Sequence, residues 1–214
     1  NFYKMINLKE KKLLIASHNE GKISEFRELL NFFDVKIISS KDLQLPEPVE
    51  DGISFEENAL IKAKSAAKLS GIVALSDDSG IEVEALDKKP GIYSARWAGP
   101  NKDFTFAMSE VNRMLNELGA VSEEKRHACF VCALCLYYPS GEHEFFVGKI
   151  DGKIVWPPRG NYGFGYDAIF LPDGLNKTFG ELTSSEKHSW AIDKAGLSHR
   201  AIAFSKFAKF LTKK

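Results

Sequence analysis

The spacing of apolar residues predicts a strand, a helix and a second strand at the start of this chain. The apolar run Leu13-Leu14-Ile15-Ala16 is typical of a short buried strand, and Val35 to Ser39 predicts the second one. Between the two runs, apolar residues recur at the spacing of one helix face: Ile23, Phe26, Leu30 and Phe33. This alternation is typical of an α/β arrangement.

A further helix is predicted where Ser54-Phe55-Glu56-Glu57 forms a capping-box pattern ahead of an alanine-rich segment. The helix would extend to about Leu69, and Gly71 is a suitable residue to end it. The stretch from Gln44 to Gly52 contains two prolines and several acids, so we expect a loop there.

The rest of the chain is rich in predicted strands and closes with a helix. We expect strands at 72–75, 81–86 and 168–171, a turn at 89–91, a hairpin of 127–138 with 144–150, and helices at 104–118, 184–194 (in part) and 200–211. The glycine- and proline-rich stretch 157–165 is too long and irregular to be a simple linker. We therefore expect an N-terminal extension (residues 1–12) and one mixed α/β domain (13–214), with two lobes around a cleft.

Composition narrows the class of protein. Hydrophobic residues make up 44% of the 214 residues, enough for a substantial core, and 29 basic residues balance 29 acidic ones. A net charge of zero argues against a general nucleic-acid binder, which usually carries a basic excess. No apolar run approaches the roughly 20 residues of a membrane helix. Residues 1–12 have no apolar core of signal-peptide length, so we expect a cytoplasmic protein.

Cys129, Cys132 and Cys135 have a spacing similar to that of a metal-cluster motif. An iron–sulfur run would need a fourth cysteine near position 139, which is proline, and the chain contains no other cysteine. In a strand, Cys129 and Cys135 would face one side and Cys132 the other. The surrounding residues are apolar, so we expect buried strand thiols.

Two adjacent carboxylates, Asp77 and Asp78, stand between two strand-like runs. Aspartate is unfavourable in strands and neighbouring acids repel, so this pair is costly unless it holds a divalent cation or a water to be activated. The alternative is a solvated turn, because Asp-Asp-Ser-Gly is also good turn chemistry.

Ser17, Asn19 and Lys22 lie where the first strand leads into the first helix. A helix N-terminus offers free N–H groups and Lys22 adds a full charge, which together suit phosphate binding. The alternative is that Ser17 or Asn19 only caps the helix. The same phosphate site could include Lys62 and the segment Glu50-Asp51-Gly52. The alternative is that they form a solvated acidic loop and a surface lysine.

Three later segments carry rings and donors. Gly163-Phe164-Gly165-Tyr166-Asp167 suits stacking of a flat ligand, or is a loop whose aromatic residues fill the core. Glu186-Lys187-His188 and Ser198-His199-Arg200 offer donors to a carbonyl oxygen or a phosphate, or are surface charges. Donors for a polyphosphate, carboxylates for Mg²⁺ and rings for a base together indicate a nucleoside triphosphate with its metal.

With these motifs together, the chain resembles the inosine triphosphate pyrophosphatase family from about Leu13 to Leu211. The matching segments are S-H-N-E-G-K at 17–22, F-E-E-N-A at 55–59, S-D-D-S-G at 76–80, P-G-I-Y-S-A-R at 90–96, G-F-G-Y-D at 163–167, E-K at 186–187 and S-H-R at 198–200. The resemblance implies a mixed α/β fold with a long central sheet, flanking helices and two lobes around a nucleotide cleft, acting as a homodimer.

The resemblance also implies a reaction and roles for the residues. The reaction is hydrolysis of non-standard purine nucleoside triphosphates (dITP, ITP, XTP or dXTP) to the monophosphate and pyrophosphate, which cleanses the nucleotide pool without direct contact to nucleic acid or membrane. Glu50, Asp77 and Asp78 would serve a Mg²⁺ site, with Asp78 also the catalytic base for the attacking water. Ser17, Asn19, Lys22 and Lys62 would hold the triphosphate, and His18, Glu20 and Gly21 complete the substrate-binding segment. The nucleoside would be bound by Ser79, Phe164, Gly165, Tyr166, Asp167, Lys187, His199 and Arg200.

The chain departs from the family pattern at three places. Ser17 replaces a common threonine but keeps the hydroxyl, Ala168 replaces a common proline and predicts a looser loop, and the segment 188–197 is longer than in the shorter relatives. Two other functions stay open. One is a house-cleaning pyrophosphatase for modified pyrimidine or other nucleotides. The other is a non-catalytic nucleotide-binding regulator, which the presence of all three acids disfavours.

Overall fold

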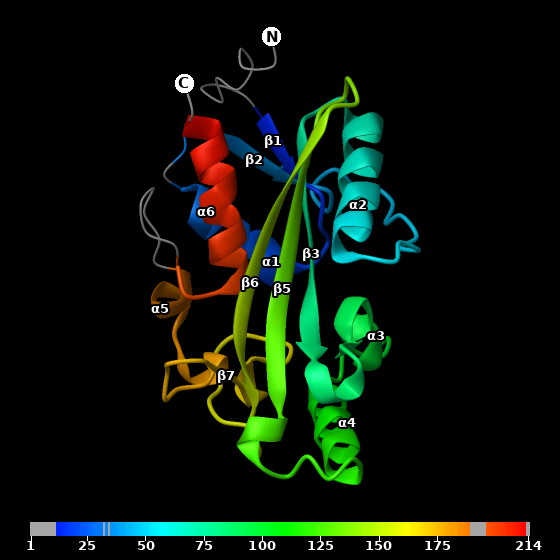
Figure 1. The fold of residues 1–214 in the computed structure, drawn as a ribbon. Coiled ribbons are helices and arrows are strands. Elements are labelled where there is room, and N and C mark those ends of the chain that lie inside the picture. Colours follow the sequence, from blue (N-terminus) through cyan, green and yellow to red (C-terminus); the bar gives the residue numbers. More distant parts are fainter. Residues whose placement is uncertain (1–11, 32, 34, 189–195, 213–214) are drawn as a thin grey trace. The chain divides into compact units, whose positions relative to one another are not determined.

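The computed structural model describes residues 12–31, 33, 35–188 and 196–212. Its strands are β1 (Lys12–Ile15), β2 (Lys36–Ser39), β3 (Ala74–Val83), β4 (Lys89–Pro90), β5 (His127–Tyr137), β6 (His143–Ile154) and β7 (Phe170–Pro172). Its α-helices are α1 (Glu20–Leu30), α2 (Phe55–Ser70), α3 (Ser94–Trp97), α4 (Phe104–Glu117), α5 (Ser184–His188) and α6 (His199–Thr212). These elements form the expected mixed α/β fold (Figure 1). Most of the predicted N-terminal extension and of the long segment 188–197 lies outside the described residues.

The chain forms two compact units. The first consists of Asn1–Asp78, Ala133–Val147 and Ala203–Lys214, and the second of Ser79–Cys132 and Gly148–Ile202. The strands β3, β5 and β6 each continue from one unit into the other. Two units agree with the two expected lobes, whereas a single catalytic domain over 13–214 stays a prediction.

The register of the parallel strands determines where the polar loops of the first unit lie. Within the described residues the sheet has seven strands in the order β2-β1-β3-β5-β6-β7, with β4 paired to β3. β1 pairs in parallel with β2 and β3, and Ile15 lies opposite Leu75. Parallel strands end at the same edge of a sheet, so the loop after β1 lies beside the residues that follow Leu75. Those residues include Asp77 and Asp78.

β3 is a continuous strand of 10 residues, so the predicted division into strands at 72–75 and 81–86 is wrong. The alternative of a solvated turn at the acidic pair is wrong for the same reason. The strand tolerates the pair because Asp77 forms an ion pair with Lys22, and Asp78 forms one with Lys62. Both lysines come from helices distant in sequence, so local strand propensity gives no sign of them.

The predicted turn at 89–91 is displaced along the chain. The first two of these residues form β4, which pairs antiparallel with the end of β3. The chain reverses instead at Asp87 and Lys88, whose φ angles are 52° and 64°. A tight hairpin needs positive φ at its turn, and aspartate adopts it more easily than most residues.

α2 has the boundaries that its sequence predicts. The Ser54 hydroxyl accepts the N–H of Glu57 at 3.1 Å, and Gly71 ends the helix with a φ of 70°. The Glu57 carboxylate accepts the N–H of Ile53 at 2.8 Å, one residue before the partner expected from a capping box.

Other elements occur where the sequence predicts them but differ from the prediction at one or both ends. α4, α6 and the hairpin of β5 with β6 are confirmed, although β6 extends to Ile154. α1 ends at Leu30, before the last apolar residue of its predicted face. The strand predicted at 168–171 is shortened to β7, because a 3-10 helix occupies Asp167–Ile169. The helix predicted in part of 184–194 is α5 as far as His188, and the rest lies outside the described residues.

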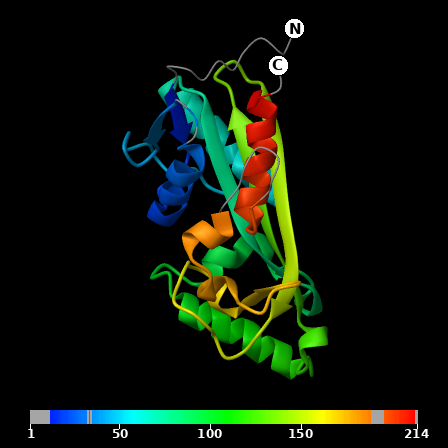
Figure 2. The ribbon, with the colours of Figure 1, turned by 90° about the vertical axis from the view of Figure 1, so that its left-hand side faces the viewer.

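Each unit has its own apolar packing. In the first unit, α2 and α6 lie on opposite sides of the strands (Figures 1 and 2), and Phe207 of α6 contacts Phe146 of β6 with ring centroids 5.4 Å apart. In the second unit, α4 packs on β3 and β7 through a core that includes Val83, Val111 and Phe170. Among the described residues, no helix is long and apolar enough to cross a membrane.

The cysteines behave as strand residues. Cys132 and Cys135 are buried in β5 and Cys129 is half-buried, and none of these three described residues forms a disulfide. Burial raises the pKa of Cys129 to about 11 and that of Cys135 to about 12. A thiol with so high a pKa carries little thiolate at neutral pH, which makes it a poor nucleophile.

Candidate active site

The loop between β1 and α1 is ordered by its own polar side chains. The Ser17 hydroxyl accepts the N–H of Asn19 at 3.1 Å, and the Asn19 side chain caps α1 by accepting the N–H of Lys22 at 3.1 Å. Asn19 therefore caps the helix, and phosphate binding by the same loop stays a prediction. A helix N-terminus preformed in this way has backbone N–H groups suited to phosphate oxygens.

His18, Glu20 and Gly21 complete this loop with different surroundings. The ring of His18 contacts the Leu45 carbonyl through Nε2 at 2.8 Å and the Glu47 carboxylate through Nδ1 at 3.2 Å. The Glu20 carboxylate pairs with Lys41, and Gly21 lies in the first turn of α1. The side chains of His18 and Glu20 thus contact other parts of the protein.

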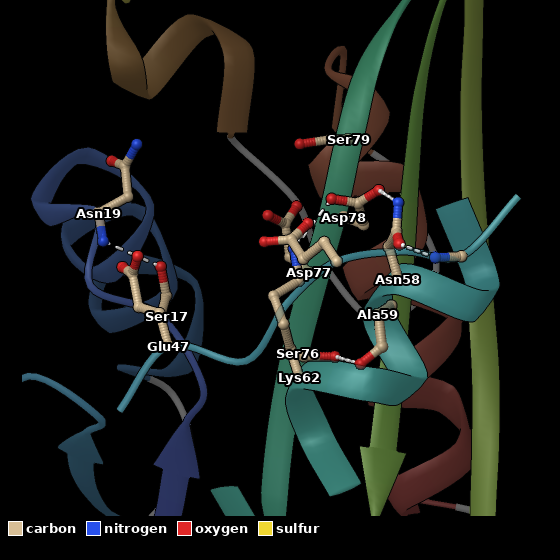
Figure 3. A network of polar contacts seen from close by, with 12 residues as sticks. Ser17, Asn19, Glu47, Asn58, Ala59, Lys62, Ser76, Asp77, Asp78 and Ser79 are labelled. Carbon is tan, nitrogen blue, oxygen red and sulfur yellow. Dashed lines mark hydrogen bonds and ion pairs between the residues drawn. The ribbon is translucent and has the colours of Figure 1, made fainter. Parts of the chain in front are cut away.

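Side-chain alternation along β3 sends the two aspartates in different directions. Ser76 and Asp78 both contact α2: the Ser76 hydroxyl donates to the Ala59 carbonyl at 2.6 Å, and Asp78 contacts Asn58 and Lys62 (Figure 3). Asp77 pairs instead with Lys22 of α1. A strand has a side-chain period of two, so Ser76 and Asp78 share a face that Asp77 does not.

Lys62 joins the two acids Glu50 and Asp78. Its Nζ lies 3.0 Å from Glu50 Oε2 and 2.9 Å from Asp78 Oδ1. Burial alone would lower the pKa of Lys62, but attraction by Asp78, Glu50 and Asp77 outweighs burial and raises it. Lys62 therefore stays charged at neutral pH.

Asp78 has the surroundings of a proton acceptor. Its side chain is 9% exposed, and burial raises its pKa, although Lys62 and Lys22 act in the opposite direction. A carboxylate with a raised pKa takes up a proton more readily than an exposed one. These surroundings are compatible with general-base chemistry at Asp78.

The carboxylates of the first unit fit a hard divalent cation by their chemistry. Glu50 and Asp78 both contact the ammonium group of Lys62, so one oxygen of each carboxylate lies close to a single positive charge. Among the described residues, no group of three or more His, Cys, Asp or Glu side chains is arranged to enclose a metal. Mg²⁺ usually needs only one or two protein carboxylates, because substrate phosphates and waters complete its octahedron.

A buried ion pair organises the loop of the second unit that carries the aromatic motif. Lys187 Nζ donates to Asp167 Oδ2 at 3.0 Å, and the same oxygen accepts the N–H of Phe164 at 3.2 Å. The side chains of Lys187 and Asp167 are only 5% and 12% exposed. The ion pair therefore fixes the backbone beside Phe164, whose ring is partly exposed.

Arg200, Ser79 and Phe164 lie together in the second unit. Arg200 Nη2 donates to the Ser79 hydroxyl at 3.0 Å, and its guanidinium carbon lies 6.0 Å from the centre of the Phe164 ring. The neighbouring His199 stacks on Phe130, with ring centroids 4.7 Å apart and planes 9° apart. These contacts place donors and an aromatic face close to one another, an arrangement suited to a purine base.

Tyr166 has a structural contact that the sequence did not indicate. Its hydroxyl donates to the Ser94 carbonyl at 2.9 Å, its ring packs edge-on against Phe104, and burial raises its pKa. The hydroxyl of Ser94 accepts the N–H of Ile81 at 2.9 Å. For Tyr166 the alternative of an aromatic residue that fills the core therefore holds. Ser94 lies in the P-G-I-Y-S-A-R segment at 90–96, which is the sequence feature that points to it.

Gly163→Ala is expected to disrupt the Lys187–Asp167 pair and to lower kcat/KM for the purine triphosphates that the resemblance implies by about 10-fold or more. A Cβ at position 163 would collide with Asp167 Oδ2 and lie 2.7 Å from Lys187 Nζ. Gly174→Ala is the matched control, because its φ of +77° nearly equals the +76° of Gly163 and a Cβ there meets nothing within 4 Å. Equal kcat/KM for the two variants would contradict this role of the ion pair.

Comparisons with known proteins agree over nearly the whole chain. A model of the Ham1 family matches residues 13–210. A curated protein of Brucella melitensis, named dITP/XTP pyrophosphatase, is 53% identical over 206 residues, which cover 94% of each chain. A protein of the same name from Mesorhizobium japonicum is 51% identical over 209 residues, or 96% of this chain and 95% of the relative.

Solved structures give the same result for the fold. A HAM1 protein from Coxiella burnetii superposes with a TM-score of 0.84 at 34% identity, covering 95% of this chain and all of the other. The Ham1 protein of Staphylococcus aureus superposes with a TM-score of 0.78 at 38% identity, covering 94% and 98%. The resemblance inferred from the motifs is thereby confirmed, and the chain belongs to the Ham1 family.

Proposed function

We propose that this chain is a nucleoside triphosphate pyrophosphatase that hydrolyses dITP, ITP and XTP or dXTP to the monophosphate and pyrophosphate. The observation that carries the proposal is the buried Asp78, with Lys62 and Asn58 on its two oxygens, in a chain about half identical to curated dITP/XTP pyrophosphatases. A basic carboxylate beside two lysines suits attack of water on a phosphate, because the lysines neutralise the negative charge of the substrate.

The residues of the first unit would act on the triphosphate. Lys22 and Lys62 would bind phosphate oxygens, and the backbone N–H groups of Ser17 to Lys22 would complete the phosphate site. Asp78 would orient a water and accept its proton as the oxygen attacks the α-phosphorus. Pyrophosphate, the leaving group, would remain bound to the lysines until release.

A divalent cation is part of the proposal, and we expect it to be Mg²⁺. Glu50 and Asp78 would hold it, and Asp77, through its pairing with Lys22, would support the arrangement. When bound, such an ion neutralises charge on phosphate oxygens.

The residues of the second unit would select the base. Arg200 and His199 would donate to the 6-carbonyl oxygen of hypoxanthine or xanthine, and Phe164 would offer its ring to the base. Ser79, Gly165, Tyr166 and the Lys187–Asp167 pair would shape the surroundings. Adenine has an amino group at position 6, so these donors would be left unpaired, and such a mismatch gives discrimination of roughly 10⁴-fold.

Hydrolysis of dITP, measured beside dATP, dGTP and dUTP with separate assays for pyrophosphate and orthophosphate, tests the function. We expect Mg²⁺-dependent release of pyrophosphate from dITP, little turnover of dATP, and loss of activity in EDTA. Preferential hydrolysis of dUTP or of methylated nucleotides would favour a house-cleaning enzyme for other nucleotides. Binding of dITP without turnover would favour a non-catalytic regulator.

A homodimer is the assembly that the resemblance implies, and we propose it together with the expected cytoplasmic location. Light scattering on the purified protein, at 23.9 kDa for each chain, tests the dimer directly.

A further inference from the structure

The side-chain amide of Asn58 has a defined orientation. Asn58 lies in α2 and is 1% exposed, and its Oδ1 accepts the N–H of Gly52 at 3.0 Å. Its Nδ2 faces Asp78 Oδ2 at 3.4 Å. The flipped amide would place oxygen against carboxylate and N–H against N–H, so the network leaves one orientation. Figure 3 shows the side chain of Asn58 directed toward Asp78.

Asn58 and Lys62 together engage both oxygens of Asp78. Lys62 Nζ donates to Oδ1 at 2.9 Å, and Asn58 takes the other oxygen. An aspartate carboxylate rotates easily about its terminal bond, because that torsion has broad minima. Two different donors on two oxygens remove this freedom.

Asn58 also connects Asp78 to the segment that carries Glu50. A Cβ at Gly52 would lie 2.8 Å from Asn58 Oδ1 and 2.8 Å from the Glu57 Cβ, so the backbone at residue 52 is in direct contact with α2. Glu50 is two residues away and shares Lys62 with Asp78. The acid on the loop and the acid on β3 are thus held to one helix by Asn58 and Lys62.

We propose that Asn58 is a positioning residue, which fixes the carboxylate plane of Asp78 and holds the Glu50 segment beside it. This role rests on the proposed function, in which Asp78 is the base. Asn58 itself touches neither substrate nor water in this role and acts through Asp78. Displacement of a reacting group by about 1 Å is enough to lower turnover by 10²-fold.

The kinetic test compares Asn58→Ala, Asn58→Asp and Ser54→Ala on dITP. Asn58→Asp keeps the size of the side chain and an acceptor for Gly52, but it cannot donate to Asp78. Ser54→Ala removes the cap of the same helix without contacting Asp78, so it controls for loss of stability. We expect kcat to fall by about 10- to 100-fold in both Asn58 variants with KM within about threefold, whereas Ser54→Ala lowers only the melting temperature.

Two results would overturn the proposal. One is a kcat for both Asn58 variants that equals that of Ser54→Ala. The other is a rise in KM with kcat unchanged, which would assign Asn58 to substrate binding. Asn58→Ser replaces Asn58→Ala if the alanine variant does not fold.

A double-mutant cycle in urea tests the contact without any activity. Asn58→Ala is measured in the wild type and in Asp78→Ala, and we expect a smaller loss of the unfolding midpoint where Asp78 is absent. Equal losses in the two backgrounds would show that Asn58 does not interact with Asp78. If the wild type does not hydrolyse dITP, the proposed function fails, while the cycle still decides whether Asn58 holds Asp78.

Discussion

Asp78→Asn is expected to lower kcat for dITP by about 10²- to 10⁴-fold, the range that a positioned general base contributes. The amide keeps the size of the carboxylate but cannot accept the proton of the attacking water. Lys62 would still pair with Glu50 at 3.0 Å, so much of the local charge arrangement would remain. Single-turnover and equilibrium binding experiments with dITP separate turnover from binding, and we expect binding to be largely retained.

Asp173→Asn is the control for Asp78→Asn, because Asp173 is exposed and lies in the other unit. Asp77→Asn gives a second comparison, since Asp77 pairs with Lys22 on the opposite face of β3. We expect a smaller kcat loss for Asp77→Asn than for Asp78→Asn. Near-normal turnover in Asp78→Asn would remove Asp78 as the base.

Arg200→Ala is expected to lower the ratio of kcat/KM for dITP to that for dATP by about 10-fold or more, out of a discrimination of roughly 10⁴-fold. The guanidinium is almost fully buried, and its contacts with Ser79 and Phe164 hold it in one orientation. In the proposed pocket, its loss would remove a donor to the 6-carbonyl oxygen, which adenine lacks. Hydrolysis of dATP should therefore fall less than hydrolysis of dITP.

Arg200→Lys and Arg113→Ala serve as controls for this prediction. Lysine keeps the charge but not the planar fork, so it should restore part of the turnover and little of the selectivity. Arg113 is half-exposed on α4, where it pairs with Glu110 and Glu117, and its loss should change neither. An unchanged ratio in Arg200→Ala would assign base selection to other residues.

Elements with strong local signals were predictable from the sequence. α2 begins at Ser54 and ends at Gly71 because both residues act within a few positions of the chain. The cap of α1 by Asn19 was predictable for the same reason, because the contact is local. Phosphate binding by residues 17–22 stays a prediction. The family motifs also selected most of the residues that lie together in each unit.

Features that depend on distant partners were not predictable. The adjacent acids Asp77 and Asp78 favoured a break in β3, because aspartate is unfavourable in strands. Lysines of two helices instead pair with both carboxylates within the strand. Tyr166 was assigned to the ligand, whereas its hydroxyl donates to the carbonyl of Ser94, 72 residues away. Asn58 lies in the F-E-E-N-A segment of the resemblance, but its contacts depend on the orientation of one amide, which only the folded chain defines.

Hydrolysis of dITP in ¹⁸O-labelled water, with mass analysis of both products, tests the central claim most directly. Attack of water on the α-phosphorus predicts one ¹⁸O atom in dIMP and unlabelled pyrophosphate. Label in the pyrophosphate, or orthophosphate as the first product, would place the attack on another phosphorus and contradict the account.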